Sequence, residues 1–282
     1  MKKKIASVLL CGAMALSMMA CGNTAEPAAT EEAETAEETT EETTEEITED
    51  TEAKAGEGLS FVIATDTTFK PFEYTDESGA FVGIDVDILA AVAEDQGFTY
   101  DLQSLGWDAA IAACQAGQAD GMIAGASITD ERKESGWIFS DGYYDATQSM
   151  TVGADSEIAA FADLEGLTVG VKTGTQGATY AESLKDEYGF EITYFEDSPT
   201  MYQAVLGGQV VACFEDTPIM KASIKDGDLA LKVLDDTANE GAPYGFAVFS
   251  DDEQQLVDLF NAGLANIKAN GVYDEIISKY LD

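Results

Sequence analysis

The sequence contains no histidine among its 282 residues. Without an imidazole, the chain has no Ser-His or Cys-His catalytic pair and no histidine-ligated zinc site. Cysteine is scarce: Cys11 and Cys21 lie near the N-terminus, and Cys114 and Cys213 lie in apolar stretches typical of small buried residues. We therefore expect no disulfide between Cys114 and Cys213, and we expect no metal and no cofactor.

Basic residues are also few. The chain has 14 Lys and Arg against 54 Asp and Glu, a formal net charge of -40. Nucleic acids and anionic lipids bind through clustered Lys and Arg, so neither is an expected partner. The single arginine, Arg132, therefore stands out, because a guanidinium holds a carboxylate through two parallel hydrogen bonds. Arg132 has either a dedicated anionic partner or, in the simpler alternative, a surface ion pair on a helix.

Residues 1–20 have the pattern of a secretory signal peptide, with Lys2, Lys3 and Lys4 before an apolar run from Ile5 to Ala20. Cys21 follows at once, and Met18-Met19-Ala20-Cys21 resembles a bacterial lipobox. The resemblance implies that Cys21 carries a lipid such as palmitate and anchors the protein to the outer face of the bacterial cell membrane. A plainly cleaved signal peptide is the alternative. No later stretch is apolar and long enough to span a bilayer, so we expect the rest to be soluble.

Residues 21–58 form an acidic, low-complexity segment. From Thr24 to Gly58 there are 14 acidic residues and no aromatic residue, and Ile47 is the only large aliphatic side chain. Such a segment buries too little apolar surface to offset the entropy of ordering, so we expect a disordered linker. It serves either as a stalk between anchor and domain or as a tail without a role.

From Leu59 onward, strand-like and helix-like stretches alternate. Helical spacing and terminal glycines predict helices over 84–96, 107–116, 178–188, 202–206, 253–268 and 272–281, and apolar runs predict strands over 59–64, 119–123, 169–171, 192–195 and 210–214. Thr129 is a predicted helix N-cap. About 220 residues arranged this way predict an α/β protein in two similar halves.

Six motifs then occur in a fixed order: ATDTTFKPFEY from Ala64, GIDVD from Gly83, ITDER from Ile128, FSDGYY from Phe139, VKTGT from Val171 and EDTP from Glu215. In this order the chain resembles the polar amino-acid-binding proteins of ABC importers, and its motifs are most similar to those of the glutamine-binding members. The resemblance covers essentially all of Leu59 to Asp282.

The resemblance implies a periplasmic-binding-protein-like type II fold, with two α/β lobes joined by two hinge crossovers that let the lobes close on a ligand. Lobe 1 is expected to comprise residues 59–142 and 248–282, and lobe 2 residues 148–242. The crossovers are expected at 143–147 and 243–247. The partners implied are an L-amino acid and an ABC permease in the membrane, with the protein itself acting as a monomer.

The same resemblance assigns the binding residues. Arg132 is expected to grip the ligand α-carboxylate, helped by Ser127 and backbone groups near Gly125, while Asp216 binds the α-ammonium from the other lobe. Phe69 and Trp107 are expected to be aromatic walls, although taken alone each is more typical of a core, and Asp216 has the alternative of a helix N-cap. The remaining expected ligand contacts are Asp66, Lys172, Thr175, Gln176 and Glu215.

The ligand predicted first is L-glutamine, because Asp66 and Lys172 together suit the donor and acceptor ends of an amide, respectively. Three features depart from the glutamine-binding pattern. Glu215 replaces a histidine and adds a carboxylate, Gln176 replaces a glycine, and the run from Arg132 to Phe139 is one residue longer. Alternatives are a basic amino acid or cystine as ligand, a dehydratase-like enzyme acting on a small acid, a sensor domain, or a purely structural lipoprotein.

Overall fold

The computed structural model describes residues 53–281. The predicted signal peptide, Cys21 and the linker as far as residue 52 lie outside the described residues. In residues 53–281, no helix combines the length and the apolar character needed to cross a membrane.

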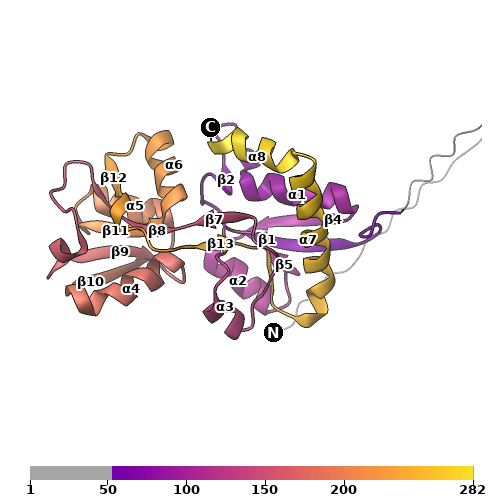
Figure 1. The fold of residues 1–282 in the computed structure, drawn as a ribbon, viewed down its shortest axis with the longest axis horizontal. Coiled ribbons are helices and arrows are strands. Elements are labelled where there is room, and N and C mark those ends of the chain that lie inside the picture. The colour runs from indigo at the N-terminus through magenta and orange to yellow at the C-terminus, as the bar shows by residue number, and fades with distance from the viewer. Residues whose placement is uncertain (1–52, 282) are drawn as a thin grey trace, which may run out of the picture. The chain divides into compact units, whose positions relative to one another are not determined.

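The described chain is built around two five-stranded sheets, one in each lobe (Figure 1). The first sheet has the order β4-β1-β5-β14-β6. Its strands are β1 (Ser60–Thr65), β4 (Thr99–Ser104), β5 (Gly121–Met122), β6 (Ile138–Phe139) and β14 (Ala247–Val248). The other elements of this lobe are the β2–β3 hairpin (Tyr74–Thr75, Phe81–Val82), the helices α1 (Ile84–Gln96), α2 (Trp107–Gln115), α3 (Asp130–Glu134), α7 (Gln254–Ala269) and α8 (Val272–Leu281), and the 3-10 turn η3 (Asp251–Glu253).

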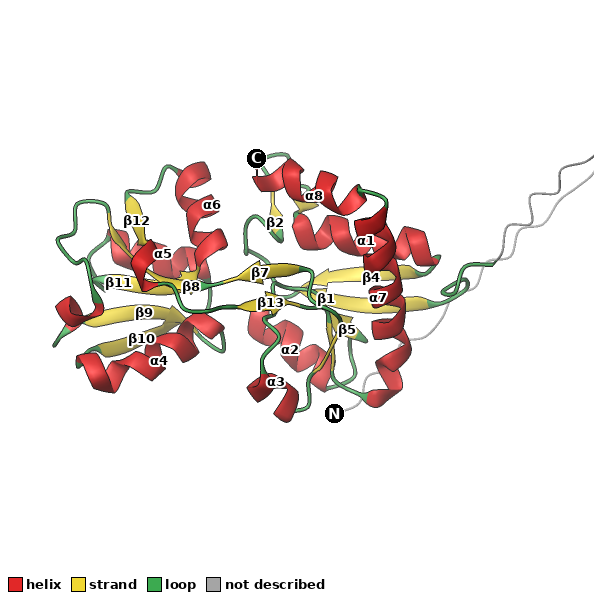
Figure 2. Cartoon of the chain, viewed as in Figure 1, coloured by secondary structure: helices red, strands yellow, loops and turns green. Residues whose placement is uncertain are grey.

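The second sheet has the order β10-β9-β11-β8-β12. Its strands are β8 (Gln148–Gly153), β9 (Thr168–Lys172), β10 (Glu191–Phe195), β11 (Ala212–Asp216) and β12 (Leu231–Leu234). The helices of this lobe are α4 (Gln176–Tyr188), α5 (Ser198–Leu206) and α6 (Thr217–Gly227), with 3-10 turns η1 (Phe161–Leu164) and η2 (Asp235–Thr237) (Figure 2).

Helices cover both faces of each sheet, because successive residues of a strand point to opposite faces. In the first lobe Ile63 packs in the cluster built with α1, α7 and α8, whereas the next residue, Ala64, packs in the cluster built with α2. In the second lobe Phe214 packs with α4, and its neighbour Cys213 packs with α5 and α6. The predicted α/β class is therefore confirmed, and both Cys114 and Cys213 are buried free thiols.

The two sheets have the same spatial arrangement of strands. In the first, β1 pairs in parallel with β4 and β5, and β14 runs antiparallel beside β5. In the second, β9 pairs in parallel with β10 and β11, and β8, the first strand of that sheet in sequence, runs antiparallel beside β11. Ligands of open parallel sheets bind beyond the carboxyl ends of the strands. Asp66 directly follows β1, Lys172 ends β9, and Asp216 ends β11.

Two short strands, β7 (Tyr144–Ala146) and β13 (Ala242–Tyr244), connect the lobes and pair with each other antiparallel. β7 lies inside the predicted crossover 143–147. β13 begins one residue before the predicted crossover 243–247, and Ala247 already pairs with Met122 and Phe139 in the first sheet. The register of β13 on β7, with Tyr244 opposite Tyr144, fixes this earlier position.

Several predicted elements appear at the expected places. α1 spans 84–96 as predicted and ends at Gly97, whose left-handed conformation (φ 82°) lets its N–H bond to Ala93 O. Thr129 caps α3 as predicted, accepting a hydrogen bond from the Arg132 N–H. Several boundaries differ by a few residues. α5 starts four residues earlier than predicted because Asp197 caps it and Pro199 is accommodated in its first turn, and β11 is two residues later than predicted because its ladder with β8 begins at Ala212.

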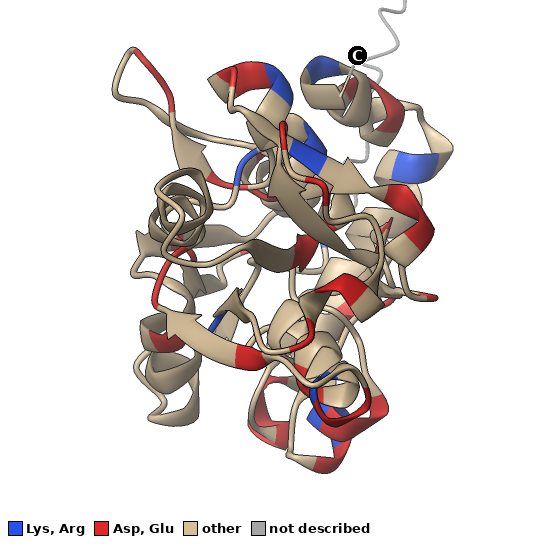
Figure 3. Ribbon diagram, turned by 90° about the vertical axis from the view of Figure 1, so that its left-hand side faces the viewer, with Lys and Arg blue, Asp and Glu red and all other residues tan. Residues whose placement is uncertain are grey.

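Acidic residues are spread over the helices and loops, with few basic residues among them (Figure 3). Leu59 to Asp282 contains 40 acidic and 10 basic residues. Most basic side chains in the described part pair with a carboxylate, as Lys221 does with Asp235 at 2.7 Å. Arg132 and Lys172 are the buried cations among the described residues, and their burial marks them as candidate binding groups.

Candidate functional site

All eleven residues expected to contact the ligand line one cavity, together with Ala124. The first lobe contributes Asp66, Phe69, Trp107, Gly125, Ser127 and Arg132, and the second lobe contributes Lys172, Thr175, Gln176, Glu215 and Asp216. Residues separated by up to 150 positions in sequence thus meet at the carboxyl ends of the two sheets. Sequence reasoning missed Ala124, which lies directly before Gly125.

Arg132 is 8% exposed, so it is not the surface ion pair of the simpler alternative. Its guanidinium carbon lies 5.1 Å from the ring centroid of Trp107 and 5.0 Å from that of Trp137. Nη1 donates to Ser127 O at 2.9 Å, and Nη2 donates to Gly174 O of the other lobe at 3.3 Å. Burial lowers the pKa of Arg132 to about 10, against the opposing effect of Asp216. The side chain stays cationic at neutral pH.

Contacts with the crossover strand β13 and with the first lobe fix the positions of Ser127 and Gly125. Ser127 forms a bridge to Tyr244 of β13, so a crossover strand fixes its position. Gly125 has φ +55°, and a Cβ there would lie 2.5 Å from Phe69 Cε1, so only glycine fits without moving that ring. The Gly125 N–H donates to Asp85 Oδ2 at 2.8 Å. That N–H is therefore engaged inside the lobe, and other groups near Gly125 have to meet the carboxylate.

Asp216 is the counterpart of Arg132 in the second lobe. It stands at the N-cap position of α6, as the alternative interpretation proposed, but its side chain makes no capping hydrogen bond. Instead Oδ1 accepts from Gln148 Nε2 at 2.6 Å, and Oδ2 accepts from the Tyr244 hydroxyl. Burial raises the pKa of Asp216, while the bonds from Tyr244 and Gln148 oppose that rise. Gln148 and Tyr244 were missed at the sequence level because both lie far from Asp216 in the sequence, at separations of 68 and 28 positions.

Asp66 and Lys172 form a buried ion pair that joins the two lobes. Asp66 Oδ1 also accepts from the Thr67 N–H at 2.6 Å. The Lys172 ammonium lies 5.3 Å from the ring centroid of Phe69, which places that ring beside the pair. Phe69 and Trp107 belong to the cores of the first lobe and also line the cavity, so both interpretations of these rings hold.

Glu215 lines the cavity and is 2% exposed. Its Oε2 accepts from Ser198 Oγ at 2.6 Å and from Tyr202 Oη at 3.0 Å, and its Oε1 accepts from the Asp216 N–H at 3.1 Å. Burial, followed by the charge of Asp216, raises the pKa of Glu215 to about 7.

The last two expected contacts lie at the start of α4. Thr175 caps α4, and Gln176 begins that helix two residues earlier than predicted.

The cavity is nearly filled by its own side chains. The volume open to the centre of a water molecule is about 20 Å³, which is room for about one water. Two further contacts connect the lobes. At the cavity, Trp107 Nε1 donates to Gly174 O at 3.3 Å. Outside the cavity, Lys70 of the first lobe forms an ion pair with Asp226 of the second lobe at 3.0 Å. An amino acid therefore enters only if the Asp66–Lys172 pair separates or the lobes move apart.

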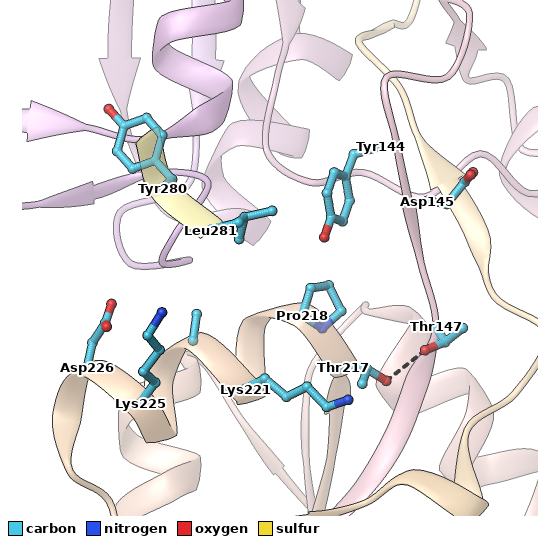
Figure 4. A pocket seen from close by; sticks show the side chains of 11 residues that line it. Tyr144, Asp145, Thr147, Thr217, Pro218, Lys221, Lys225, Asp226, Tyr280 and Leu281 are labelled. Carbon is cyan, nitrogen blue, oxygen red and sulfur yellow. Dashed lines mark hydrogen bonds between the residues drawn. The ribbon is translucent and has the colours of Figure 1, made fainter. Parts of the chain in front are cut away.

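A second, larger hollow of about 430 Å³ lies beside the β7 crossover (Figure 4). We call it the hinge groove. Tyr280 and Leu281 of α8 face Pro218, Lys221 and Lys225 of α6 across it. At its base Thr147 Oγ1 donates to Thr217 Oγ1 at 2.8 Å. Although larger, the hinge groove is open to solvent, and none of the eleven residues expected to contact the ligand lines it.

The comparisons with known proteins agree with this geometry. The chain is 30% identical over 284 aligned positions to a protein of Neisseria gonorrhoeae described as a probable histidine-binding protein, and the alignment covers 99% of this chain and 96% of the relative.

Among solved structures, substrate binding domain 2 of Lactococcus lactis GlnP in an open conformation is 36% identical, with a TM-score of 0.57 and coverage of 81% of this chain and 98% of that one. An ancestral arginine-binding protein bound to arginine is 30% identical, with a TM-score of 0.73 and coverage of 79% and 98%. The structure of an ancestral arginine-binding protein bound to glutamine is 31% identical, with a TM-score of 0.72 and coverage of 78% and 97%.

The family model for bacterial extracellular solute-binding proteins, family 3, matches residues 61–282. This range begins within β1 and includes both sheets, both crossovers and every residue that lines the cavity. With two lobes of matching topology and the cavity between them, the chain belongs to the family 3 bacterial extracellular solute-binding proteins.

Proposed function

We propose that this protein captures a polar, uncharged L-amino acid, L-glutamine first, between its two lobes and delivers it to an ABC importer. The observation that carries the proposal is the placement of Arg132 and Asp216 on opposite lobes of one cavity. An α-amino acid presents one carboxylate and one ammonium at its α-carbon, and this pair of side chains offers one charge of each opposite sign. Hydrogen bonds to charged groups contribute about 1.5–3 kcal/mol each.

The rest of the cavity supports a polar side chain on the ligand. Asp66 and Lys172 meet beyond the strand ends of the two lobes, so a ligand that separates them has to replace their mutual bond. A carboxamide does so with both of its ends, because its oxygen accepts from Lys172 and its nitrogen donates to Asp66. A second cation would be repelled by Lys172 and a second anion by Asp66.

In this proposal, a lipid anchor at Cys21 keeps the protein on the membrane. The lipobox-like Met18–Cys21 places the modified residue ahead of a 37-residue acidic linker, residues 22–58, which keeps a monomeric binding domain close to its permease. Because a single short chain anchors weakly, a diacylated cysteine is the form that would hold the protein stably. The protein would act outside the cell membrane.

A binding role is favoured over catalysis by the arrangement of charges. An enzyme needs an acid or base placed against the reacting atoms. The cavity instead offers Arg132 and Asp216 on opposite lobes, a pair that matches the two charged groups of a zwitterion.

The test is calorimetry of the chain after the predicted signal peptide with the common L-amino acids and three analogues of glutamine. D-glutamine reverses the α-carbon, N-acetyl-L-glutamine removes the α-ammonium, and L-glutaminamide removes the α-carboxylate. We expect L-glutamine to bind and all three analogues to bind at least tenfold more weakly. Equal binding of the analogues, or no binding of any amino acid, would refute the proposed clamp.

A further inference from the structure

The cavity carries more negative than positive charge. Its ionisable residues are three carboxylic acids (Asp66, Glu215 and Asp216) and two cations (Arg132 and Lys172). With every group ionised, the cavity has a net charge of -1. A ligand with a neutral side chain leaves that charge uncompensated, and a ligand with a cationic side chain cancels it.

Glu215 keeps only neutral hydrogen-bond partners even when the proposed ligand is bound. Asp66 bonds to the Lys172 ammonium, and the ammonium of the proposed ligand would meet Asp216. Glu215 accepts only from two hydroxyls, Ser198 and Tyr202, and from a peptide N–H. Neutral donors stabilise a carboxylate less than a cation does, so protonation is least costly at this position.

We infer that the protonation of Glu215 selects the charge of the ligand side chain, so that the protonated site prefers a neutral amino acid and the ionised site prefers a cationic one such as arginine. This inference rests on the proposed function and names its ligand classes. Both ligand classes occur in the family, since ancestral arginine-binding proteins have been solved with arginine and with glutamine.

The groups around Glu215 allow this change near neutral pH. From β9 the Lys172 ammonium favours the ionised form, and from β11 the neighbouring Asp216 opposes it. From α5 the hydroxyls of Ser198 and Tyr202 face it, and the Cys213 thiol, buried in the same strand, stays neutral. Burial is the largest effect and raises the pKa of Glu215 to about 7. A cationic ligand favours the carboxylate, so its binding strengthens as pH rises through this value.

The experiment measures the dissociation constants of L-glutamine and L-arginine at pH 5.5 and pH 8.0 in one salt concentration. Arginine is used in place of histidine because the imidazole itself titrates in this range. We expect the preference for arginine over glutamine to rise by about tenfold or more between the two pH values, the change that one unit of ligand-induced pKa shift produces. A ratio that stays constant while both ligands bind would overturn the inference and leave the proposed function intact.

The Glu215→Gln variant keeps an oxygen acceptor for Ser198 and Tyr202 and removes the titration. We expect its ratio to be independent of pH and to favour glutamine at both values. The matched control is Glu182→Gln, because Glu182 accepts from Tyr194 Oη at 2.8 Å on the exposed surface of the same lobe. The control should behave as the unmodified protein. A pH dependence that persists in Glu215→Gln would assign it to another group and overturn the inference.

A second measurement needs no variant. At pH 7, arginine binding should release protons and glutamine binding should take up protons or leave them unchanged, as calorimetry in buffers of different ionisation enthalpy reveals. Equal proton exchange for both ligands would contradict the role of Glu215. Failure of every amino acid to bind would instead refute the proposed function.

Discussion

Replacement of Arg132 by alanine is the sharpest test of the binding site. In the proposed complex, the guanidinium would face the ligand carboxylate inside a cavity that now has room for about one water. Two unit charges about 4 Å apart attract by about 4 kcal/mol at an effective dielectric constant of 20. Loss of one partner of such a pair costs about 2–5 kcal/mol, so we expect the affinity for L-glutamine to fall by about 30-fold to several thousand-fold.

Arg132→Lys separates charge from geometry. A lysine keeps the positive charge but loses the planar fork and its position 5.1 Å from Trp107 and 5.0 Å from Trp137. We expect an affinity between those of the alanine variant and the unmodified protein.

The matched control is Lys133→Ala, which removes the next cation along α3, paired with Asp130 at 3.5 Å on the surface. Its affinity should be unchanged. Calorimetry measures the affinities, and circular dichroism confirms that each variant is folded, because Arg132 also bonds to Ser127 O. A loss of less than tenfold in folded Arg132→Ala would refute the assignment.

Three further predictions follow from other residues. Cys21→Ser should move the protein from the membrane fraction to the soluble fraction or leave the signal peptide uncleaved, and unchanged mass and fractionation would contradict lipidation. Asp66→Asn breaks the buried ion pair with Lys172 and should lower glutamine affinity by about tenfold or more, as measured by calorimetry; an unchanged affinity would argue against this pair as the side-chain contact. Glu73→Gln is a prediction about stability. Burial and the nearby Asp85 raise the pKa of Glu73 well above its usual value, so the folded state prefers the protonated acid. The unmodified protein therefore loses stability as pH rises above about 4.5, the ordinary pKa of Glu73 in the unfolded chain. Thermal unfolding at pH 4.5 and pH 8 should show that the melting temperature of Glu73→Gln, relative to that of the unmodified protein, is higher at pH 8 than at pH 4.5. An equal difference in melting temperature at both pH values would contradict this prediction.

Much of the fold follows from local chemistry that the sequence displays. Gly97 ends α1 because glycine adopts the left-handed conformation without strain, and Thr129 begins α3 because its hydroxyl satisfies a free N–H. The family resemblance supplied all eleven expected binding residues, seven of which lie in the six motifs, and all eleven line a single cavity. Their action on a ligand stays a prediction until binding is measured.

Other elements carried too weak a local signal. β7 and β13 are three residues each, and their strand conformation depends on pairing with each other across a long sequence separation. Similarly, β4 has only an alternating pattern of half-buried residues, and its position is fixed by its register on β1. Such pairing is decided by the whole sheet, so propensity alone did not reveal these strands.

By itself, the sequence determined the α/β class, the scarcity of cations and the identity of the charged residues that line the cavity, because these depend on composition, periodicity and ordered motifs. Only the tertiary structure decided what each charge touches. It joined Asp66 to Lys172, gave Asp216 to Gln148 and Tyr244, and gave Glu215 to Ser198 and Tyr202. The physical reason is that burial and hydrogen-bond partners set the charge state of a group, and both come from residues far away in the chain.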